Sequence, residues 1–310
     1  MGLFSIASKT AARARYAAEQ GLRSAWYGAQ MSAARRNAGG FNRAGEPKFE
    51  PTRGTPDMAA LRKAYLDLFI QDRLNAEAGL YPAPHDVRVR DLPNALKSAR
   101  AFRAESAELY DTQVEALFTG TADAMRRAAL AEISRELKGR DQRRASLLDL
   151  ACGNGRFLSR VMSVYPRLQA TGLDLSPSYT DAARKRLARW PQVSVLHEAA
   201  EAMPLPEASL DMVVSVFLFH ELPPAVRAQV LAEVARILKP GGLFILADST
   251  QFGDYPDMDG LLEYFPHGFH EPYYETYLSW DIADACANAG LANERETLAF
   301  LTKVTTWRKA

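Results

Sequence analysis

Beyond position 146 the chain alternates between short, unbroken hydrophobic runs and stretches in which hydrophobic residues recur every three or four positions. The unbroken runs predict strands at 146–150, 169–174, 193–196, 211–217 and 243–247. The periodic stretches predict helices at 155–164, 177–189, 224–238 and 281–289. Strands without polar alternation are covered on both faces, so this order predicts an α/β fold with a doubly wound, mostly parallel sheet.

The first 145 residues contain no strand pattern and indicate a helical front. Gly and Pro residues between 39 and 56 form a linker, and Thr55 is placed to cap the helix that follows it. Helices are predicted over 3–36, 57–78, 94–118 and 121–138. We therefore divide the chain into a basic helical extension with its linker (1–54), a helical cap region (55–145) and the sheet domain (146–310).

Charge is balanced overall but unevenly distributed. The 310 residues include 38 Lys or Arg and 37 Asp or Glu, a net charge of +1, which gives no general attraction to nucleic acid. Residues 1–53 carry nine basic and three acidic side chains. One interpretation is that residues 1–36 dock on a membrane surface or a partner. We favour packing on the chain's own body or on a second subunit, because the hydrophobic stripe here is mostly alanine and buries little area.

Cysteine content and the distribution of apolar residues bear on the compartment. Cys152 and Cys286 are too few for a disulfide framework, and we expect both to be reduced. No apolar run reaches the roughly 18–20 residues of a membrane span, and arginines interrupt any secretory signal in residues 1–18. We expect a cytoplasmic monomer or homodimer, with peripheral membrane contact through residues 1–36 as an option. In a eukaryote, the same Arg-rich start is typical of a mitochondrial presequence.

The first predicted strand runs into a glycine loop that suits a nucleoside without a diphosphate. Gly153 and Gly155 allow a tight turn, but Leu158 stands where a dinucleotide site needs a third glycine, and the Gly-Lys-Ser/Thr of a P-loop is absent. Asp174, at the end of the second strand, is placed to accept hydrogen bonds from ribose hydroxyls. Asp149 beside the loop favours a cationic or amine-bearing ligand. A nucleoside with a sulfonium and an amino-acid tail satisfies all of these conditions.

Four segments in this order resemble the class I S-adenosylmethionine-dependent methyltransferases, in particular the group related to the ubiquinone/menaquinone C-methyltransferases. They are residues 148–157 (LDLACGNGRF), 172–176 (GLDLS), 210–222 (LDMVVSVFLFHEL) and 238–248 (LKPGGLFILAD). Together they span about a third of the chain. The resemblance implies a Rossmann-like sheet of seven strands, closed by an antiparallel pair within 291–306, and S-adenosyl-L-methionine as the cofactor.

The resemblance also implies which residues hold the cofactor. Asp149, Ala151 and the glycines would line the methionine end, while Asp174 and Leu175 would hold the ribose and stack on adenine. Ala199 stands where the family commonly has an Asp for the adenine amino group, which leaves that contact to Ala200, Glu201 or water. The complete set of predicted cofactor residues is Asp149, Ala151, Cys152, Gly153, Gly155, Asp174, Leu175, Ala200, Glu201 and Phe217.

Two regions supply candidates for proton transfer or acceptor binding. His220, with Glu221 beside it at the end of the fourth predicted strand, is a candidate general base or a structural histidine. The aromatic segment 264–274 follows the fifth strand; it either forms an acceptor pocket or is a Pro-fixed loop that fills the sheet edge. Its candidates are His267, His270, Glu271 and Tyr274. Their spacing is not that of a familiar metal site, and no metal is predicted.

We therefore expect in-line transfer of a methyl group from S-adenosylmethionine to a small-molecule acceptor, with a lipid or quinone-like compound as one option. Residues 215–219 lack the Asn/Asp-Pro-Pro-aromatic run of nucleobase amino methyltransferases, which argues against a nucleic-acid substrate. The alternative is a methyltransferase-like binding or assembly protein without catalysis.

Overall fold

The computed structural model describes residues 52–54, 56–82, 111, 114, 115, 118, 120–269 and 271–310. The predicted extension at 3–36 lies outside the described residues, and so does almost all of the helix predicted over 94–118. Within the described parts of the chain, no helix is long and apolar enough to cross a membrane.

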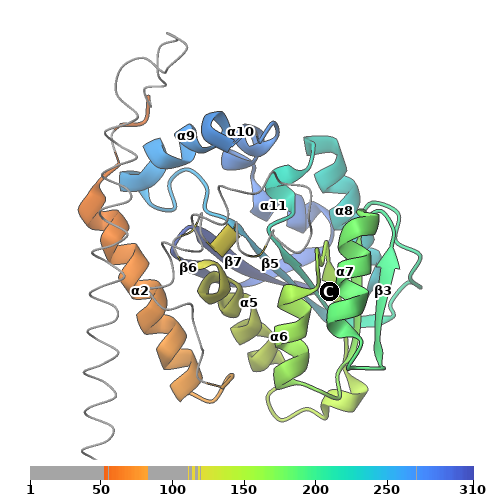
Figure 1. Cartoon of the computed structure of the whole chain (residues 1–310). Coiled ribbons are helices and arrows are strands. Elements are labelled where there is room, and N and C mark those ends of the chain that lie inside the picture. Colours follow the sequence, from red (N-terminus) through yellow and green to blue (C-terminus); the bar gives the residue numbers. More distant parts are fainter. Residues whose placement is uncertain are drawn as a thin grey trace, which may run out of the picture.

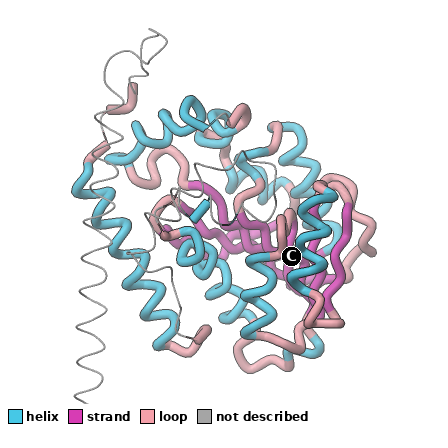
Figure 2. The backbone as a smooth tube through the Cα atoms, in the orientation of Figure 1, coloured by secondary structure: helices cyan, strands magenta, loops and turns pink. Residues whose placement is uncertain are grey.

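A seven-stranded sheet with the order β3-β2-β1-β4-β5-β7-β6 forms the centre of the molecule (Figures 1 and 2). Strands β1 to β5 are parallel, and β7 lies antiparallel between β5 and β6. This confirms the predicted doubly wound sheet and its antiparallel closing pair. The strands are β1 (Ser146–Leu150), β2 (Gln169–Asp174), β3 (Val193–His197), β4 (Leu210–Val216), β5 (Leu238–Ser249), β6 (Leu291–Ala299) and β7 (Thr302–Lys309).

Helices cover both faces of the sheet because its strands are apolar on both sides. Neighbouring strand residues alternate between two cores, as Leu147 and Leu148 or Phe244 and Ile245 do. One core contains α5, α6 and α7, and the other contains α8 and α11. These helices are α5 (Ala122–Glu136), α6 (Arg156–Val164), α7 (Pro177–Leu187), α8 (Pro224–Ile237) and α11 (Ile282–Asn288).

The predicted helix over 57–78 is α2 (Met58–Glu77), but its predicted cap was wrong. Asp57, not Thr55, is the N-cap residue, and its carboxylate accepts a hydrogen bond from the backbone N–H of Ala59. An N-cap side chain accepts from the second or third residue of the helix, and Ala59 is the second residue of α2, so the cap belongs at position 57.

The segment after β5 is helical, and not the Pro-fixed loop that was one of its two interpretations from the sequence. Residues 259–269 form α9 (Asp259–Phe269), which includes Pro266, and a second helix, α10 (Tyr274–Leu278), follows it. Short 3-10 turns at Gln142–Arg144, Phe219–Glu221 and Pro256–Met258 join neighbouring elements. In Figure 1, α9 and α10 lie side by side above the sheet.

A buried ion pair joins two helices of the helical front, and shared apolar cores join the front to the sheet. Arg127 of α5 donates two hydrogen bonds to Asp72 of α2, at 2.9 and 2.8 Å, and Tyr81 donates a third at 2.9 Å. Tyr65 of α2 packs edge-on against Phe300, between β6 and β7. Helix α5 also contributes to the core beneath the sheet. The boundary between the cap region and the sheet domain at residue 146 therefore stays a prediction based on the sequence pattern, because the packing runs across it.

We predict that Asp72→Ala lowers the free energy of unfolding by about 3–5 kcal/mol, because it leaves the Arg127 guanidinium buried without its counterion. Urea denaturation followed by circular dichroism measures the effect. Asp67→Ala is the matched control: Asp67 pairs with Lys63 at the solvent-exposed side of the same helix, and its loss should cost less than about 0.5 kcal/mol. Similar losses of unfolding free energy in the two variants would contradict the stabilising role of the buried Asp72–Arg127 ion pair.

Candidate active site

The loop from β1 to α6 has the backbone conformation that its glycines permit. Gly153 and Gly155 have φ values of 52° and 77°, in the left-handed region that glycine adopts without strain. Ala151 has a φ of 58°, which costs an alanine more than a glycine. A Cβ at Gly155 would lie 3.2 Å from the backbone of Ala183, so this glycine also lets the loop pack against α7.

Asp174 holds this loop to the end of β2. One carboxylate oxygen accepts a hydrogen bond from the backbone N–H of Gly153 at 2.8 Å, and the other accepts one from Ser176 at 2.9 Å. The backbone N–H of Cys152 donates to the carbonyl of Leu173 at 2.9 Å. A carboxylate has about four acceptor positions, so two remain for a ligand.

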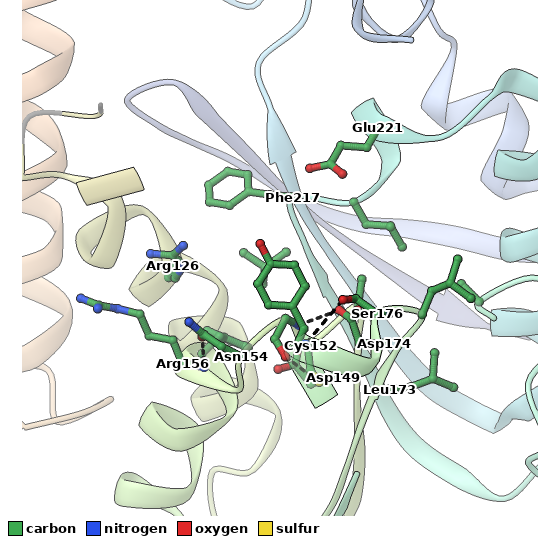
Figure 3. A pocket seen from close by; sticks show the side chains of 18 of the residues that line it. Arg126, Asp149, Cys152, Asn154, Arg156, Leu173, Asp174, Ser176, Phe217 and Glu221 are labelled. Atoms are coloured by element: carbon green, nitrogen blue, oxygen red, sulfur yellow. Dashed lines mark hydrogen bonds between the residues drawn. The ribbon is translucent and has the colours of Figure 1, made fainter. Parts of the chain in front are cut away.

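These elements surround a cavity of about 440 Å³ beyond the carboxyl ends of β1, β2 and β4. Every residue predicted to bind the cofactor lines it except Gly155, which lies behind the loop. In Figure 3, Asp149 and Asp174 lie at one end of this cavity, and Phe217 and Glu221 lie at the other. The position is the one at which doubly wound sheets bind ligands.

The pKa of Asp149 is set mainly by its burial. Its side chain is buried, and burial together with the charge of Asp174 raises the pKa of Asp149 to about 8. One of its oxygens, Oδ2, has no hydrogen-bond partner among the described residues. Two more buried atoms without such a partner, Asp111 Oδ1 and Arg126 Nη1, belong to residues that line the same cavity. A ligand with both positive and negative groups would satisfy these atoms, and S-adenosylmethionine is such a ligand.

The cavity is also lined by two arginines whose role the sequence analysis did not predict, one from the helical front and one from the sheet domain. Arg126 comes from α5, and Arg156, the first residue of α6, donates hydrogen bonds of 2.7 and 2.6 Å to Asp123. Burial alone would raise the pKa of Asp123, but the hydrogen bonds and charge of Arg156 outweigh it and hold that pKa below its usual range. No local motif marks Arg126, because its neighbours in the cavity are distant in sequence.

His220 is placed differently from what a general base requires. Its Nδ1 lies 2.5 Å from Asp248 Oδ1, its side chain is buried, and it does not line the cavity. Burial alone would lower the pKa of His220, but the charge and hydrogen bond of Asp248 outweigh this and raise it to about 9. An imidazole that already carries a proton at neutral pH accepts no other. The role of His220 as a base stays a prediction that this geometry disfavours.

Glu221, next to His220, does line the cavity. Its Oε1 is 3.9 Å from His220 Nε2, and burial, followed by the negative charges of Glu271, Asp248 and Asp174, raises its pKa despite the opposing charge of His220. The sequence analysis mentioned Glu221 only as a neighbour of His220. Figure 3 places its carboxylate beside Phe217, away from Asp149.

The remaining catalytic candidates lie apart from the cavity or outside the described side chains. Tyr274 is buried, its hydroxyl lies 2.5 Å from Ser249 Oγ, and its ring packs edge-on against His220. This is the packing role that the sequence left open for the aromatics of this segment. Glu271 acts on His220 through its charge. His270 and the side chain of His267 are outside the described parts. No cluster of three or more His, Cys, Asp or Glu in the described parts could hold a metal ion.

Comparison with known proteins agrees with this geometry. Residues 147–242 match the model of a family described as "Methyltransferase domain". An uncharacterized methyltransferase of Synechocystis is 34% identical over 102 residues, which are 33% of this chain and 46% of that protein. A demethylmenaquinone methyltransferase of Deinococcus radiodurans is 34% identical over 147 residues, 47% of this chain and 57% of that protein. The chain spans about half the length of these curated relatives.

Solved structures of low sequence identity are also similar. A SAM-dependent methyltransferase from Aquifex aeolicus has a TM-score of 0.44 at 18% identity, over 58% of this chain and 88% of that one. The 1,6-didemethyltoxoflavin-N1-methyltransferase of Burkholderia thailandensis has a TM-score of 0.47 at 19% identity, over 74% of this chain and 92% of that one.

Residues 147–242 match a methyltransferase domain in sequence. The sheet around them has the doubly wound, Rossmann-like order that the resemblance to class I S-adenosylmethionine-dependent methyltransferases implied. The match covers the glycine loop and the strands from β1 to the start of β5.

We predict that Asp149→Asn flattens the pH dependence of stability of the ligand-free protein. Because the pKa of Asp149 is raised from an ordinary value of about 3.9 to about 8, the folded chain retains a proton that the unfolded chain releases. Stability contributed by this group is present below pH 4 and is lost as the pH rises to 8. The melting temperature of the variant should therefore exceed that of the wild type at pH 8 but not at pH 4.

Differential scanning fluorimetry between pH 4 and pH 8 measures this difference. Asp257→Asn, at an exposed position, is the control and should follow the wild-type curve. Parallel curves for Asp149→Asn and the wild type would contradict the shifted pKa.

Proposed function

We propose that this chain binds S-adenosylmethionine in the cavity at the ends of β1, β2 and β4 and transfers its methyl group to a small-molecule acceptor. The observation that carries the proposal is the carboxylate of Asp174. Backbone N–H groups of Gly153 and Ser176 fix both of its oxygens at the cavity wall, and each oxygen retains an acceptor position. Such a carboxylate suits the two adjacent hydroxyls of a ribose.

Other residues along the cavity suit the remaining parts of the cofactor. Leu175, next to Asp174, is a large apolar side chain that is 68% exposed, and it offers a flat apolar surface to an adenine ring. Ala200 and Glu201 line the cavity nearby and take the place of the Asp that the family commonly has. The turn at Gly153 brings backbone close to the ligand without a side chain between them.

The reaction asks the protein to position the acceptor and exclude water. When bound, S-adenosylmethionine supplies an electrophilic methyl group on a sulfonium. Phe217, Leu218 and Leu222 line the acceptor end of the cavity with apolar surface, which keeps water away from the reacting atoms. Glu221 lies among them, and its pKa is raised, mainly by burial, which makes its carboxylate a stronger base toward a proton of the acceptor. We infer that protonated His220, fixed by Asp248, positions Glu221 and is not itself the base.

A quinone-like acceptor is the narrower proposal. Several relatives of this chain bear the name demethylmenaquinone methyltransferase. The apolar lining at Phe217, Leu218 and Leu222 is compatible with a planar, hydrophobic ring, and Glu221 could accept the proton that a hydroquinone loses as its ring carbon is methylated.

We predict that Asp174→Ala weakens binding of S-adenosylhomocysteine by about 10- to 100-fold, because the ribose hydroxyls lose their acceptor. Isothermal titration calorimetry measures the affinity, and circular dichroism checks that the variant remains folded. Asp181→Ala, on the exposed side of α7, is the matched control and should bind like the wild type. Unchanged affinity in Asp174→Ala would remove the basis of the proposal.

We predict that the wild-type protein transfers label from radioactive S-adenosylmethionine to a demethylated naphthoquinol, and that Glu221→Gln lowers turnover by about 100-fold without weakening S-adenosylhomocysteine binding. Glu207→Gln, at an exposed position, is the control. Labelling of other small molecules only would overturn the quinone-like acceptor. Cofactor binding with no transfer to any tested class would favour the non-catalytic alternative.

A further inference from the structure

We propose that Arg227 of α8 is a positioning residue: it binds the turn Phe219–Glu221 to helix α10 and thereby fixes the carboxylate of Glu221 at the acceptor end of the cavity. This inference rests on the proposed function, in which Glu221 is the base, and it names a residue on which that base depends. Arg227 does not line the cavity, so it acts through the groups that it holds.

Arg227 is a buried cation without a bonded carboxylate. Its residue is 1% exposed, and its hydrogen bonds within the described parts of the chain go to two backbone carbonyls and one hydroxyl. Its Nη1 has no hydrogen-bond partner among the described residues. A charge buried in this way is costly, and an apolar side chain of similar volume would fill the same space at a lower cost. The hydrogen bonds of the guanidinium are what such a replacement would lose.

Two nitrogens of the guanidinium bridge segments that are distant in sequence. Nε donates to the carbonyl of Phe219 at 2.9 Å. Nη2 donates to the carbonyl of Tyr273 at 2.8 Å and to Oγ1 of Thr276 at 3.0 Å. Phe219 begins the turn after β4, and Tyr273 is the N-cap residue of α10. One planar side chain therefore sets the separation between this turn and the start of α10.

The backbone of Phe219 is fixed from both sides by buried charged groups. Its N–H donates to Asp248 Oδ2 at 2.7 Å, and its carbonyl accepts the hydrogen bond from Arg227. Two side chains of opposite charge thus orient the residue that directly precedes His220 and Glu221. The direction in which the turn presents Glu221 to the cavity follows from this orientation.

Helix α10 also forms the surface against which His220 packs. The rings of Tyr274 and Tyr277 lie edge-on to the imidazole, with centres 5.6 and 6.2 Å away. Because His220 Nε2 lies 3.9 Å from Glu221 Oε1, a shift of α10 would move the cation that faces the base. Arg227 therefore acts on Glu221 by two routes, through the backbone of the turn and through α10.

Aromatic packing limits the movement of the guanidinium. Its central carbon lies 5.3 Å from the centre of a Trp280 ring and 5.6 Å from that of Tyr277. The ring of Phe219 stacks on Trp280, with centres 5.7 Å apart. These contacts offset part of the cost of the buried charge and keep the donor nitrogens aimed at their acceptors.

Replacement by lysine keeps the positive charge but removes the planar group that reaches three acceptors. We expect Arg227→Lys to lower kcat by about 30- to 100-fold for the demethylated naphthoquinol, or for whichever tested acceptor the wild type methylates, because a small displacement of reacting groups costs this much. The affinity for S-adenosylhomocysteine should change by less than about twofold, since the lysine leaves the cofactor end intact. Hydrogen exchange, followed by mass spectrometry, should become faster in residues 218–223 and 272–278.

Arg236→Lys is the matched control, because Arg236 lies on the same helix and also donates to two backbone carbonyls, those of Met203 and Leu205. It should change neither kcat nor the exchange of residues 272–278. Thr276→Val removes one acceptor of Arg227 at an exposed position and tests the same bridge if Arg227→Lys does not fold. It should lower kcat by about two- to fivefold.

The outcomes separate this role from the proposed function. Unchanged kcat in Arg227→Lys and Thr276→Val, unchanged hydrogen exchange, or equal losses of kcat and S-adenosylhomocysteine affinity would overturn the positioning role and leave the proposed function standing. A wild-type chain that does not bind S-adenosylhomocysteine, or that methylates no tested acceptor, would overturn the proposed function and with it any role for Arg227 at the base.

Discussion

The carboxylate of Asp174 is the interaction on which the rest of the site depends. It bonds to the backbone of two loops at once, at Gly153 after β1 and at Ser176 before α7, and so fixes the distance between the ends of two neighbouring strands. The glycine turn is held in its left-handed conformation by the same contact. The proposed ribose site therefore depends on one side chain, and the sheet register places that side chain at the cavity.

The sheet, and the grouping of Asp174 with the glycine loop at one cavity, could be predicted from the sequence because their signals are local. A buried strand followed by a Gly-Asn-Gly turn, and a second strand that ends in Asp174, each occupy a few consecutive positions. Parallel strands then bring their carboxyl ends to one edge without further information. The antiparallel pair of β6 and β7 was expected from the family resemblance alone, because no local pattern in 291–306 had marked it.

Features that depend on long-range contacts could not be predicted. The charge state of His220 is set by Asp248, 28 positions away, and no pattern near His220 reveals it. Arg126 resembles any other arginine of an amphipathic helix until α5 packs beneath the sheet. Pro266 suggested a loop, but the residues around it form α9, because packing of that segment outweighs the local cost of one proline.

The strand order has a consequence for how the polypeptide assembles as it is synthesised. Strand β5, which holds the apolar run Leu243 to Ala247, has β4 on one side and β7 on the other, and β7 begins more than fifty positions downstream. Until the ribosome has released Thr302–Lys309, one edge of the most apolar strand has no hydrogen-bonding neighbour. Unpaired edges of this kind recruit strands from other molecules. The helices α9 to α11 are synthesised during this interval, so the β5 edge has no strand partner until the last elements of the sheet are made.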